Sequence, residues 1–424
     1  MSVRAPRIAM TGVTGFLGRN LLFEVIRQNR SRLDALQIAV LGRPASNGEA
    51  LKERIREILA GDDFECLRLS REAVDFLLSR VFQFIDVDFT SDDVHLAPDD
   101  FTRLASAPID WFFHLAGLTD LRTGRPSEMA LHRVNMEGTS RVLQLVSRLR
   151  VREFCYVGTA YSCGITSGRI NPDDLSPGRQ FRNPYERSKC SAELLVREFA
   201  RKTGTRCRYF RPATICGRLL EPPLGAVSKF DVFYSWPAFF ARMSRKAAQQ
   251  GARHPRVLNV RVCYNRRSGL NIVPVDYVAK AMYLVCDQDH PGSSYHLVND
   301  AETPHSRYIP QLLEAIGVSG VTQVDHVPVS RNALEDLYYR TVGALYTPYI
   351  TCGPMLFESM NLKPLLSRAG LRCPAISPRA LGSLMRYAIE RDFGMADGRA
   401  PTRQAAAAAS AHCRDERLYA EVNP

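Results

Sequence analysis

The sequence predicts an α/β fold with a Rossmann-type, doubly wound parallel sheet and a smaller C-terminal portion. A short apolar run at residues 7–11 is followed at once by glycines spaced G-x-x-G-x-x-G and then by a helical pattern. Further strand-like runs then alternate with helical patterns, which is typical of a parallel sheet. The 424 residues suffice for such a core and a second portion.

The glycine-rich turn after the first strand predicts a site for the phosphates of a nucleotide. Gly12 lets the chain turn sharply, Gly15 lets the backbone approach a pyrophosphate, and Gly18 lets the helix pack closely. The free N–H groups at the start of that helix favour an anion. The alternative is a plain corner between strand and helix. The residues expected to contact the cofactor in this turn are Gly12, Thr14, Gly15, Phe16, Leu17, Gly18 and Arg19.

Composition and charge narrow the class of protein. The formal net charge of +12 could indicate nucleic acid or an acidic membrane surface. Basic residues are spread along the chain, however, so we expect an anionic cofactor and no nucleic-acid partner. No apolar run approaches the roughly 20 residues of a membrane span. The eleven cysteines contain no C-x-x-C pair, and no signal peptide precedes the first strand, so we expect no metal site and a cytoplasmic location.

The second and third strands are expected to meet the adenosine half of the cofactor. Residues 37–41 form a strand that ends near Arg43, where an arginine favours a 2′-phosphate, so NADP is preferred and NAD is possible. The alternative is that Arg43 stacks on adenine or faces solvent. Residues 49–78 are helical in period, and residues 82–87 form the third strand. Asp86 at its end meets the adenine edge or caps the next turn.

The fourth and fifth strands are expected to end beside the nicotinamide. A helix begins at Pro98, and residues 111–117 form a buried strand whose small final residues, with Leu115 and Ala116, leave room for the riboside. His114 is expected to be a packed core residue. Residues 128–149 form a helix in which Asn135 braces the site or links two helices. The fifth strand, residues 152–161, presents Thr159 at its carboxyl end, where ligands of open α/β sheets bind.

A tyrosine and a lysine follow at helical spacing. A loop at residues 171–182 leads into a helix to about residue 203, on which Tyr185 and Lys189 lie one turn apart. An ammonium near a phenol stabilises the phenolate and lowers its pKa from about 10. Lys189 can also hold the ribose hydroxyls, and the Thr159 hydroxyl can orient a carbonyl oxygen. We therefore predict Thr159, Tyr185 and Lys189 as the catalytic residues, with structural packing as the alternative.

The later part of the chain is expected to bind the substrate. Residues 211–217 form a strand and turn in which Pro212 and Ile215 lie near the nicotinamide. Residues 222–243 crowd seven large apolar side chains together, either as the wall of a pocket or as ordinary packing. Residues 242–267 are rich in arginine. These side chains would either contact phosphopantetheine, CoA or another anion, or form a solvated face. Strands are expected at 257–264 and 295–298, a strand and helix at 271–283, and a helix at 308–316. Helices follow up to Phe393, then a low-complexity tail.

Together these motifs resemble the extended short-chain dehydrogenase/reductase family over about residues 7–300. Its Y-x-x-x-K motif matches Tyr185 and Lys189, and its hydroxyl residue matches Thr159. Within the family the chain is most similar to the thioester-reductase and fatty-acyl-CoA-reductase branch. The segments that carry this likeness are Gly15–Gly18, Tyr156–Tyr161, Asn183–Glu186 and the acidic stretch after the third strand.

The resemblance implies an NAD(P)H-dependent oxidoreductase that reduces a ketone, aldehyde or acyl thioester of a hydrophobic substrate, free or linked to an acyl carrier or CoA. A role in secondary metabolism and a homodimer are compatible with it. The alternatives are a nucleotide-sugar epimerase or dehydratase, a steroid-type hydroxyl dehydrogenase, and a non-catalytic redox sensor. We expect a cofactor and catalytic domain at 1–217, a substrate-binding cap at 218–393 with 271–300 returning to the core, and a mobile tail at 394–424.

Overall fold

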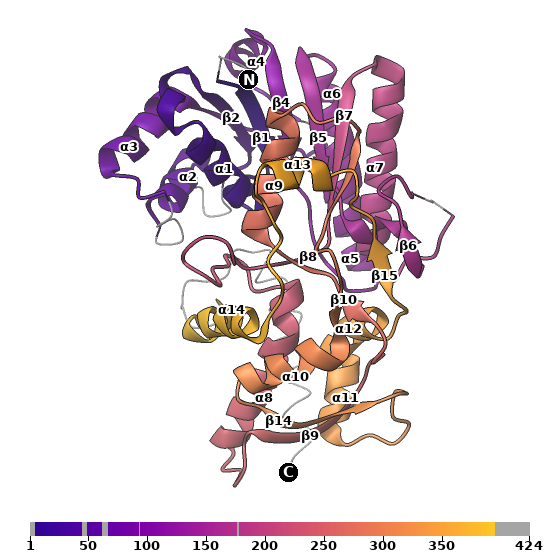
Figure 1. The fold of residues 1–424 in the computed structure, drawn as a ribbon. Coiled ribbons are helices and arrows are strands. Elements are labelled where there is room, and N and C mark those ends of the chain that lie inside the picture. Colours follow the sequence, from indigo (N-terminus) through magenta and orange to yellow (C-terminus); the bar gives the residue numbers. More distant parts are fainter. Residues whose placement is uncertain (1–4, 45–48, 62–66, 93, 176–177, 395–424) are drawn as a thin grey trace.

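The computed structural model describes residues 5–44, 49–61, 67–92, 94–175 and 178–394. Its centre is a seven-stranded sheet whose neighbouring strands are all parallel (Figure 1). The expected fold class is confirmed. In spatial order the strands are β12 (Ser294–Leu297), β7 (Arg206–Pro212), β5 (Val151–Val157), β4 (Ile109–His114), β1 (Arg7–Thr11), β2 (Gln37–Gly42) and β3 (Phe82–Asp86). The expected tail lies outside the described residues, apart from Gly394.

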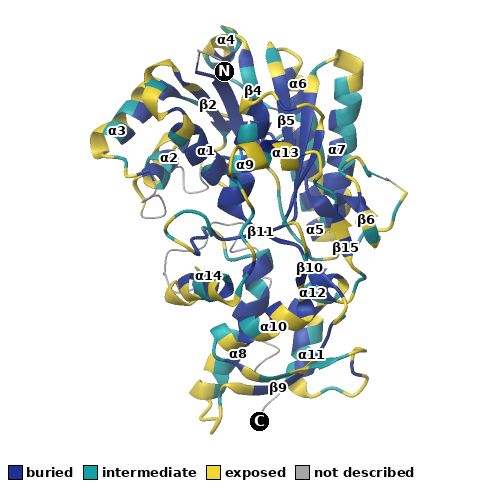
Figure 2. Ribbon diagram, viewed as in Figure 1, coloured by how far each residue is buried: buried dark blue, intermediate teal, exposed yellow. Residues whose placement is uncertain are grey.

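Helices cover both faces of this sheet, because its strands are apolar on both sides. One face packs against α1 (Phe16–Gln28), α2 (Leu51–Ala60), α9 (Val275–Asp287) and α13 (Lys363–Arg368). The other face packs against α4 (Pro98–Ala105), α6 (Gly138–Val146) and α7 (Pro184–Thr203). Figure 2 shows the strands of this layer largely buried. The short helix α3 (Arg71–Phe76) adds Val74 to the core of the first face, and the short helix α5 (Arg125–Leu131) packs beside α7.

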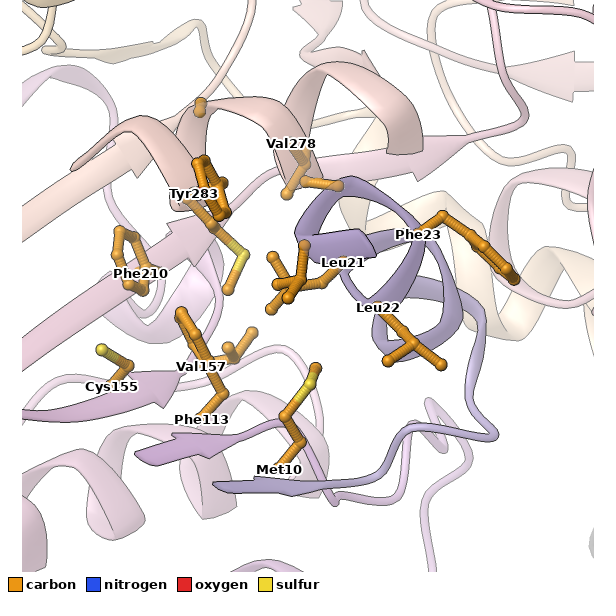
Figure 3. Close-up of a cluster of buried hydrophobic side chains, with 14 of the residues drawn as sticks. Met10, Leu21, Leu22, Phe23, Phe113, Cys155, Val157, Phe210, Val278 and Tyr283 are labelled. Atoms are coloured by element: carbon orange, nitrogen blue, oxygen red, sulfur yellow. The ribbon is translucent and has the colours of Figure 1, made fainter. Parts of the chain in front are cut away.

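Part of the segment 271–300 packs against the central sheet and its helices. Strand β12 pairs with β7, and α9 packs beside α1. Figure 3 shows Val278 and Tyr283 of α9 facing Leu21 of α1 above the sheet residues Met10 and Phe113. Burying these apolar side chains fixes α1, and with it the turn between β1 and α1.

The rest of the chain forms a cap with its own apolar core at the carboxyl end of the sheet. Phe16, the first residue of α1, packs against this cap. Its sheet pairs β9 (Val257–Cys263) with β14 (Ser319–Val324). Its helices are α8 (Ser235–Gln249), α10 (His305–Ala315), α11 (Ala333–Arg340), α12 (Val342–Ile350) and α14 (Pro378–Glu390). The short paired strands are β6 (Gly168–Ile170) with β15 (Met355–Phe357), β8 (Thr214–Cys216) with β11 (Ile272–Pro274), and β10 (Gly269–Leu270) with β13 (Thr303–Pro304).

Several predicted boundaries were wrong. The fifth strand ends at Val157, and residues 160–163 form a 3₁₀ turn, because Gly158 and Thr159 leave the sheet edge. The fourth strand ends at His114, three residues early. The single helix expected at 128–149 is α5, a π-helical stretch at 132–137 and α6. Strands β14 and β15 lie where only helices were expected, since each needs a partner distant in sequence.

Candidate active site

The turn between β1 and α1 has the close packing that its glycines predict. Gly12 has φ +72°, and a Cβ there would lie 2.5 Å from the backbone nitrogen of Ala116. A Cβ on Gly18 would lie 2.1 Å from the carbonyl oxygen of Gly12. Gly15 is the N-cap of α1, and no acidic residue lies in the first turn of that helix. This turn therefore fits a pyrophosphate, held by backbone N–H groups at the helix N-terminus.

The other expected cofactor residues line the same carboxyl edge of the sheet. Arg43 follows β2, Asp86 ends β3, Leu115 and Ala116 follow β4, and Pro212 ends β7. Across the sheet their spatial order is Asp86, Arg43, Leu115 with Ala116, and Pro212. Ile215 lies in β8, which begins two residues after the end of β7 and pairs with β11 outside the seven-stranded sheet. Their contacts with a cofactor stay predictions.

Two of the expected cofactor residues are arginines, and Arg43 was expected near a 2′-phosphate. The Arg43 side chain is about half exposed (52%) and lies 3.9 Å from the carboxylate of Asp88. An exposed ion pair of this length is weak, so a phosphate can replace the carboxylate. Arg19 instead donates a hydrogen bond from Nη2 to the carbonyl oxygen of Thr14, at 3.0 Å. It thus braces the turn between β1 and α1.

The three expected catalytic residues converge at the middle of this edge. Thr159 lies two residues beyond β5, and Tyr185 and Lys189 lie in the first two turns of α7. Helix α7 begins there because the Asn183 side chain caps it and Pro184 occupies its first turn. Hydrogen bonds from Thr159 and Thr119 to Tyr185 act to lower the phenol pKa, but burial outweighs them and raises it to about 12. The phenol is therefore protonated at neutral pH.

Lys189 is buried and faces the space in front of Gly117. Its Nζ donates to the carbonyl oxygen of Val157 at 2.7 Å and lies 5.1 Å from the centre of the Tyr156 ring. A Cβ on Gly117 would lie 3.4 Å from the same Nζ. Burial lowers the pKa of Lys189 to about 8, and the charge of Glu193 opposes this shift. Lys189 was expected to lower the Tyr185 pKa, but burial makes the net shift of Tyr185 upward.

Polar side chains behind these residues fix the loop after β4. Asn135 accepts from Leu118 N at 2.8 Å and donates to Ser188 of α7 at 2.9 Å, so it both braces the site and links two helices. His114 hydrogen-bonds Thr11 at 2.8 Å and Thr139 at 3.0 Å. Burial lowers its pKa to about 3, so it is a neutral core residue, as expected.

Sequence reasoning missed two contributors to the site. Thr119 bonds Tyr185 from the loop after β4, and nothing in its spacing marked it. Glu193 lies one turn beyond Lys189 and forms a fully buried ion pair with Arg211 of β7, with Oε1–Nη2 at 2.6 Å. The run of four-residue steps through Tyr185, Lys189 and Glu193 could have revealed the second. This ion pair ties α7 to the sheet behind the site.

The aromatic stretch of the cap is mainly packing. Phe233, Tyr234, Trp236 and Phe240 are all buried in the apolar core of the cap. The Tyr234 hydroxyl accepts from Gly217 N at 2.9 Å, which joins the stretch to the turn after β8. These four side chains therefore support the cap.

Among the residues that the structure describes, one buried group of possible metal ligands lies away from this site. Glu153, Cys155 and Cys286 place their ligand atoms within 4.8 Å of one another. However, Arg208 Nε lies 2.6 Å from the Glu153 carboxylate, and Arg206 lies 3.0 Å from it. Guanidinium groups already compensate this carboxylate, which disfavours a cation.

The fold and the grouped Thr, Tyr and Lys side chains define the extended short-chain dehydrogenase/reductase class. Residues 10–282, more than half of the chain, match the model of an NAD-binding family described as male sterility protein. The chain belongs to this family, which confirms the resemblance to the thioester-reductase and fatty-acyl-CoA-reductase branch.

Individual relatives are distant in sequence. The chain is 26% identical over 349 residues to the L-2-aminoadipate reductase large subunit of Penicillium chrysogenum, covering 78% of this chain and 22% of that protein. It is 24% identical over 252 residues to human fatty acyl-CoA reductase 2, covering 53% and 46%. The chain thus spans less than half of the length of these relatives. The terminal R domain of the myxalamid PKS-NRPS pathway has the same fold, with a TM-score of 0.68, 24% identity and 92% coverage of both chains.

Proposed function

We propose that this protein is a reductase that uses NADPH to reduce the carbonyl group of a hydrophobic acyl thioester, aldehyde or ketone. The observation that carries the proposal is the convergence of Thr159, Tyr185 and Lys189 at the carboxyl edge of the sheet, beside a turn shaped for a pyrophosphate. The names of the relatives favour the same chemistry, since they include an aminoadipate reductase and a fatty acyl-CoA reductase.

A role for each residue follows from this geometry. The bound cofactor would supply the hydride. The Thr159 hydroxyl hydrogen-bonds Tyr185 and makes two further, long contacts of 3.4 Å, to Tyr161 N and Pro212 O, so it would meet the substrate carbonyl that Tyr185 protonates. Tyr185, held protonated by burial, would donate the proton to the oxygen as the carbonyl is reduced. Lys189 would hold the ribose hydroxyls and stabilise the phenolate as it forms.

Substrate linkage, location and domain limits belong to the same proposal. We propose a substrate carried on CoA or an acyl-carrier protein, a cytoplasmic enzyme, and a boundary near residue 217 between the catalytic domain and its cap. Within the described ranges, no helix has the length and apolar character needed to cross a membrane.

Cofactor preference tests the placing of Arg43. We expect NADPH to bind at least tenfold more tightly than NADH, because a charge-assisted hydrogen bond contributes about 1.5–3 kcal/mol. The Arg43→Ala variant should lose this preference in a fluorescence titration. The exposed Arg56 of α2, paired with Glu53 and Asp75, provides the control, and Arg56→Ala should keep the preference. Equal affinities for both cofactors in the unaltered protein would refute the NADPH assignment.

The pH dependence of kcat/KM tests the proposed role of the Lys189 ammonium. Its pKa of about 8 means that the ammonium is charged below pH 8 and loses its charge as the pH rises through that value. We therefore expect kcat/KM to fall on the alkaline side with an apparent pKa of about 8, while Tyr185 stays protonated. In Lys189→Arg the guanidinium stays charged, so this limb should disappear. Lys280→Arg, which alters a lysine paired with Glu24 and Glu221, should keep it. A limb that persists unchanged in Lys189→Arg contradicts the assignment.

A further inference from the structure

Thr119, in the loop that follows β4, hydrogen-bonds the phenol of Tyr185. Thr159 hydrogen-bonds the same phenol from the segment that follows β5, so two hydroxyl groups from separate loops meet at one oxygen. A phenol that has given up its proton is only an acceptor, whereas a threonine hydroxyl carries a proton that it can donate. Both threonines can therefore donate to Tyr185 at the moment when its phenolate forms.

A buried asparagine fixes the position of Thr119 relative to Tyr185. The Asn135 side chain accepts from Leu118 N at 2.8 Å and donates to Leu118 O at 3.0 Å, so both backbone groups of the preceding residue are held. The same amide nitrogen donates to Ser188 Oγ at 2.9 Å, and Ser188 Oγ donates to the Tyr185 carbonyl oxygen at 2.8 Å. One side chain thus joins the loop to the turn of α7 that carries Tyr185.

The residue that follows Thr119 is held as well. The Asp120 carboxylate accepts from Arg122 N at 3.0 Å and from Arg122 Nε at 2.9 Å. It also accepts from the Ser127 hydroxyl at the start of α5. Thr119 therefore lies between two fixed residues, and the loop holds its hydroxyl against Tyr185. Donors that are positioned in advance stabilise a developing charge without a cost of reorganisation.

The other surroundings of Tyr185 disfavour a phenolate. Burial raises the pKa of the phenol most, and the negative charges of Glu186 on α7 and Asp231 in the cap raise it further. Glu186 is paired with Arg182 at 3.3 Å. Asp231 is paired with Lys229 at 2.5 Å. The hydrogen bonds from the two threonines act in the opposite direction and lower the pKa, because they favour the charged form.

We propose that Thr119 is a second catalytic hydroxyl, which donates a hydrogen bond to the Tyr185 oxygen as that oxygen releases its proton. The inference rests on the proposed function, in which Tyr185 protonates the reduced carbonyl. As the carbonyl carbon takes up the hydride, the Tyr185 O–H bond breaks and the carbonyl oxygen gains the proton. Because Thr159 would meet the substrate carbonyl, Thr119 is the threonine that stays on the phenolate, and it keeps its own proton.

Titration of the phenol at position 185 tests the inference without any turnover. In the full chain, 3,5-difluorotyrosine takes the place of Tyr185, because its more acidic phenol titrates closer to neutral pH, and fluorine NMR follows its ionisation. Thr119→Val keeps the shape of the side chain but removes the donor, so we expect the acid dissociation constant to fall about tenfold or more. Thr119→Ser keeps the donor and should leave the constant within about threefold of that of the unaltered chain.

A threonine distant from the site supplies the control. Thr102 of α4 donates to the carbonyl oxygen of Pro98 at 2.8 Å, and Thr102→Val should leave the titration at position 185 unchanged. Lys189 is unaltered in every one of these variants, so its own titration is common to all the curves. An unchanged dissociation constant in Thr119→Val would overturn the inference.

Kinetics then separate a catalytic role from support of the loop. We expect Thr119→Val to lower kcat about tenfold or more while NADPH affinity is kept. In the Tyr185→Phe background it should cause no further loss, because no phenolate forms there. Equal losses in both backgrounds would assign Thr119 to packing and refute its catalytic role. Absence of NADPH oxidation with every carbonyl substrate would refute the proposed reduction alone, since the fluorine titration does not depend on turnover.

Discussion

Replacing Tyr185 with phenylalanine is expected to lower kcat by about 10²- to 10⁴-fold, the usual contribution of a general acid. The substitution removes only the hydroxyl, so α7 and the Thr159 side chain should keep their positions. Steady-state NADPH oxidation measures the loss, and a separate titration should give an NADPH affinity close to that of the unaltered protein. The physical reason is that burial keeps the Tyr185 phenol protonated and able to donate its proton, whereas phenylalanine has no proton to donate.

A second tyrosine controls for the general cost of losing a hydroxyl group. Tyr339 of α11 donates to the carbonyl oxygen of Arg261 at 2.9 Å, within the cap. Tyr339→Phe should leave kcat within about twofold, even if the cap is slightly less stable. If Tyr185→Phe retained kcat within tenfold, Tyr185 would not be the proton donor.

The substitution Gly18→Ala is expected to abolish tight cofactor binding and to destabilise the fold. The added Cβ would lie 2.1 Å from the carbonyl oxygen of Gly12, and neither atom belongs to a flexible side chain. Helix α1 must therefore move away from the turn, and the N–H groups that face the pyrophosphate move with it. Overpacking in a core costs typically 1–3 kcal/mol, and a backbone contact this short should reach the upper end. Thermal unfolding and NADPH titration measure the two effects.

Another helical glycine provides the matched control. A Cβ on Gly382 in α14 would meet open space, with no atom within 4 Å beyond its own turn of the helix. Gly382→Ala should leave NADPH binding unchanged and stabilise the protein by up to about 1 kcal/mol, since alanine is the better helix former. Equal NADPH affinities of the two alanine variants would contradict the close packing at Gly18.

Local patterns explain why so much of residues 1–217, the part expected to bind the cofactor, could be predicted from the sequence. The turn at Gly12 and the step from Tyr185 to Lys189 each depend on residues close in the chain. Parallel strands then bring their carboxyl ends to one edge, so Thr159 lies at that edge although its strand ends two residues earlier.

The remainder depends on pairings between distant segments, which no local pattern encodes. Strand β14 pairs with β9 across more than fifty residues, and β15 pairs with β6 across a longer gap. Glu193 forms its buried ion pair only in the folded chain, where β7 places Arg211 beside it. The net pKa shift of Tyr185 likewise depends on how deeply the folded chain buries it, and the spacing to Lys189 does not contain that information.

The proposed hydride transfer can be followed directly by tracing deuterium from the cofactor to a product. The protein is mixed with a long-chain acyl-CoA and NADPH deuterated at nicotinamide C4, and the products are analysed by mass spectrometry. If Tyr185 donates the proton as NADPH donates the hydride, we expect stoichiometric NADPH oxidation, one deuterium per hydride transferred on the former carbonyl carbon, and loss of both signals in Tyr185→Phe. Tightly retained NAD without net oxidation or deuterium transfer across thioesters, aldehydes and ketones would contradict it and favour an enzyme that recycles its cofactor.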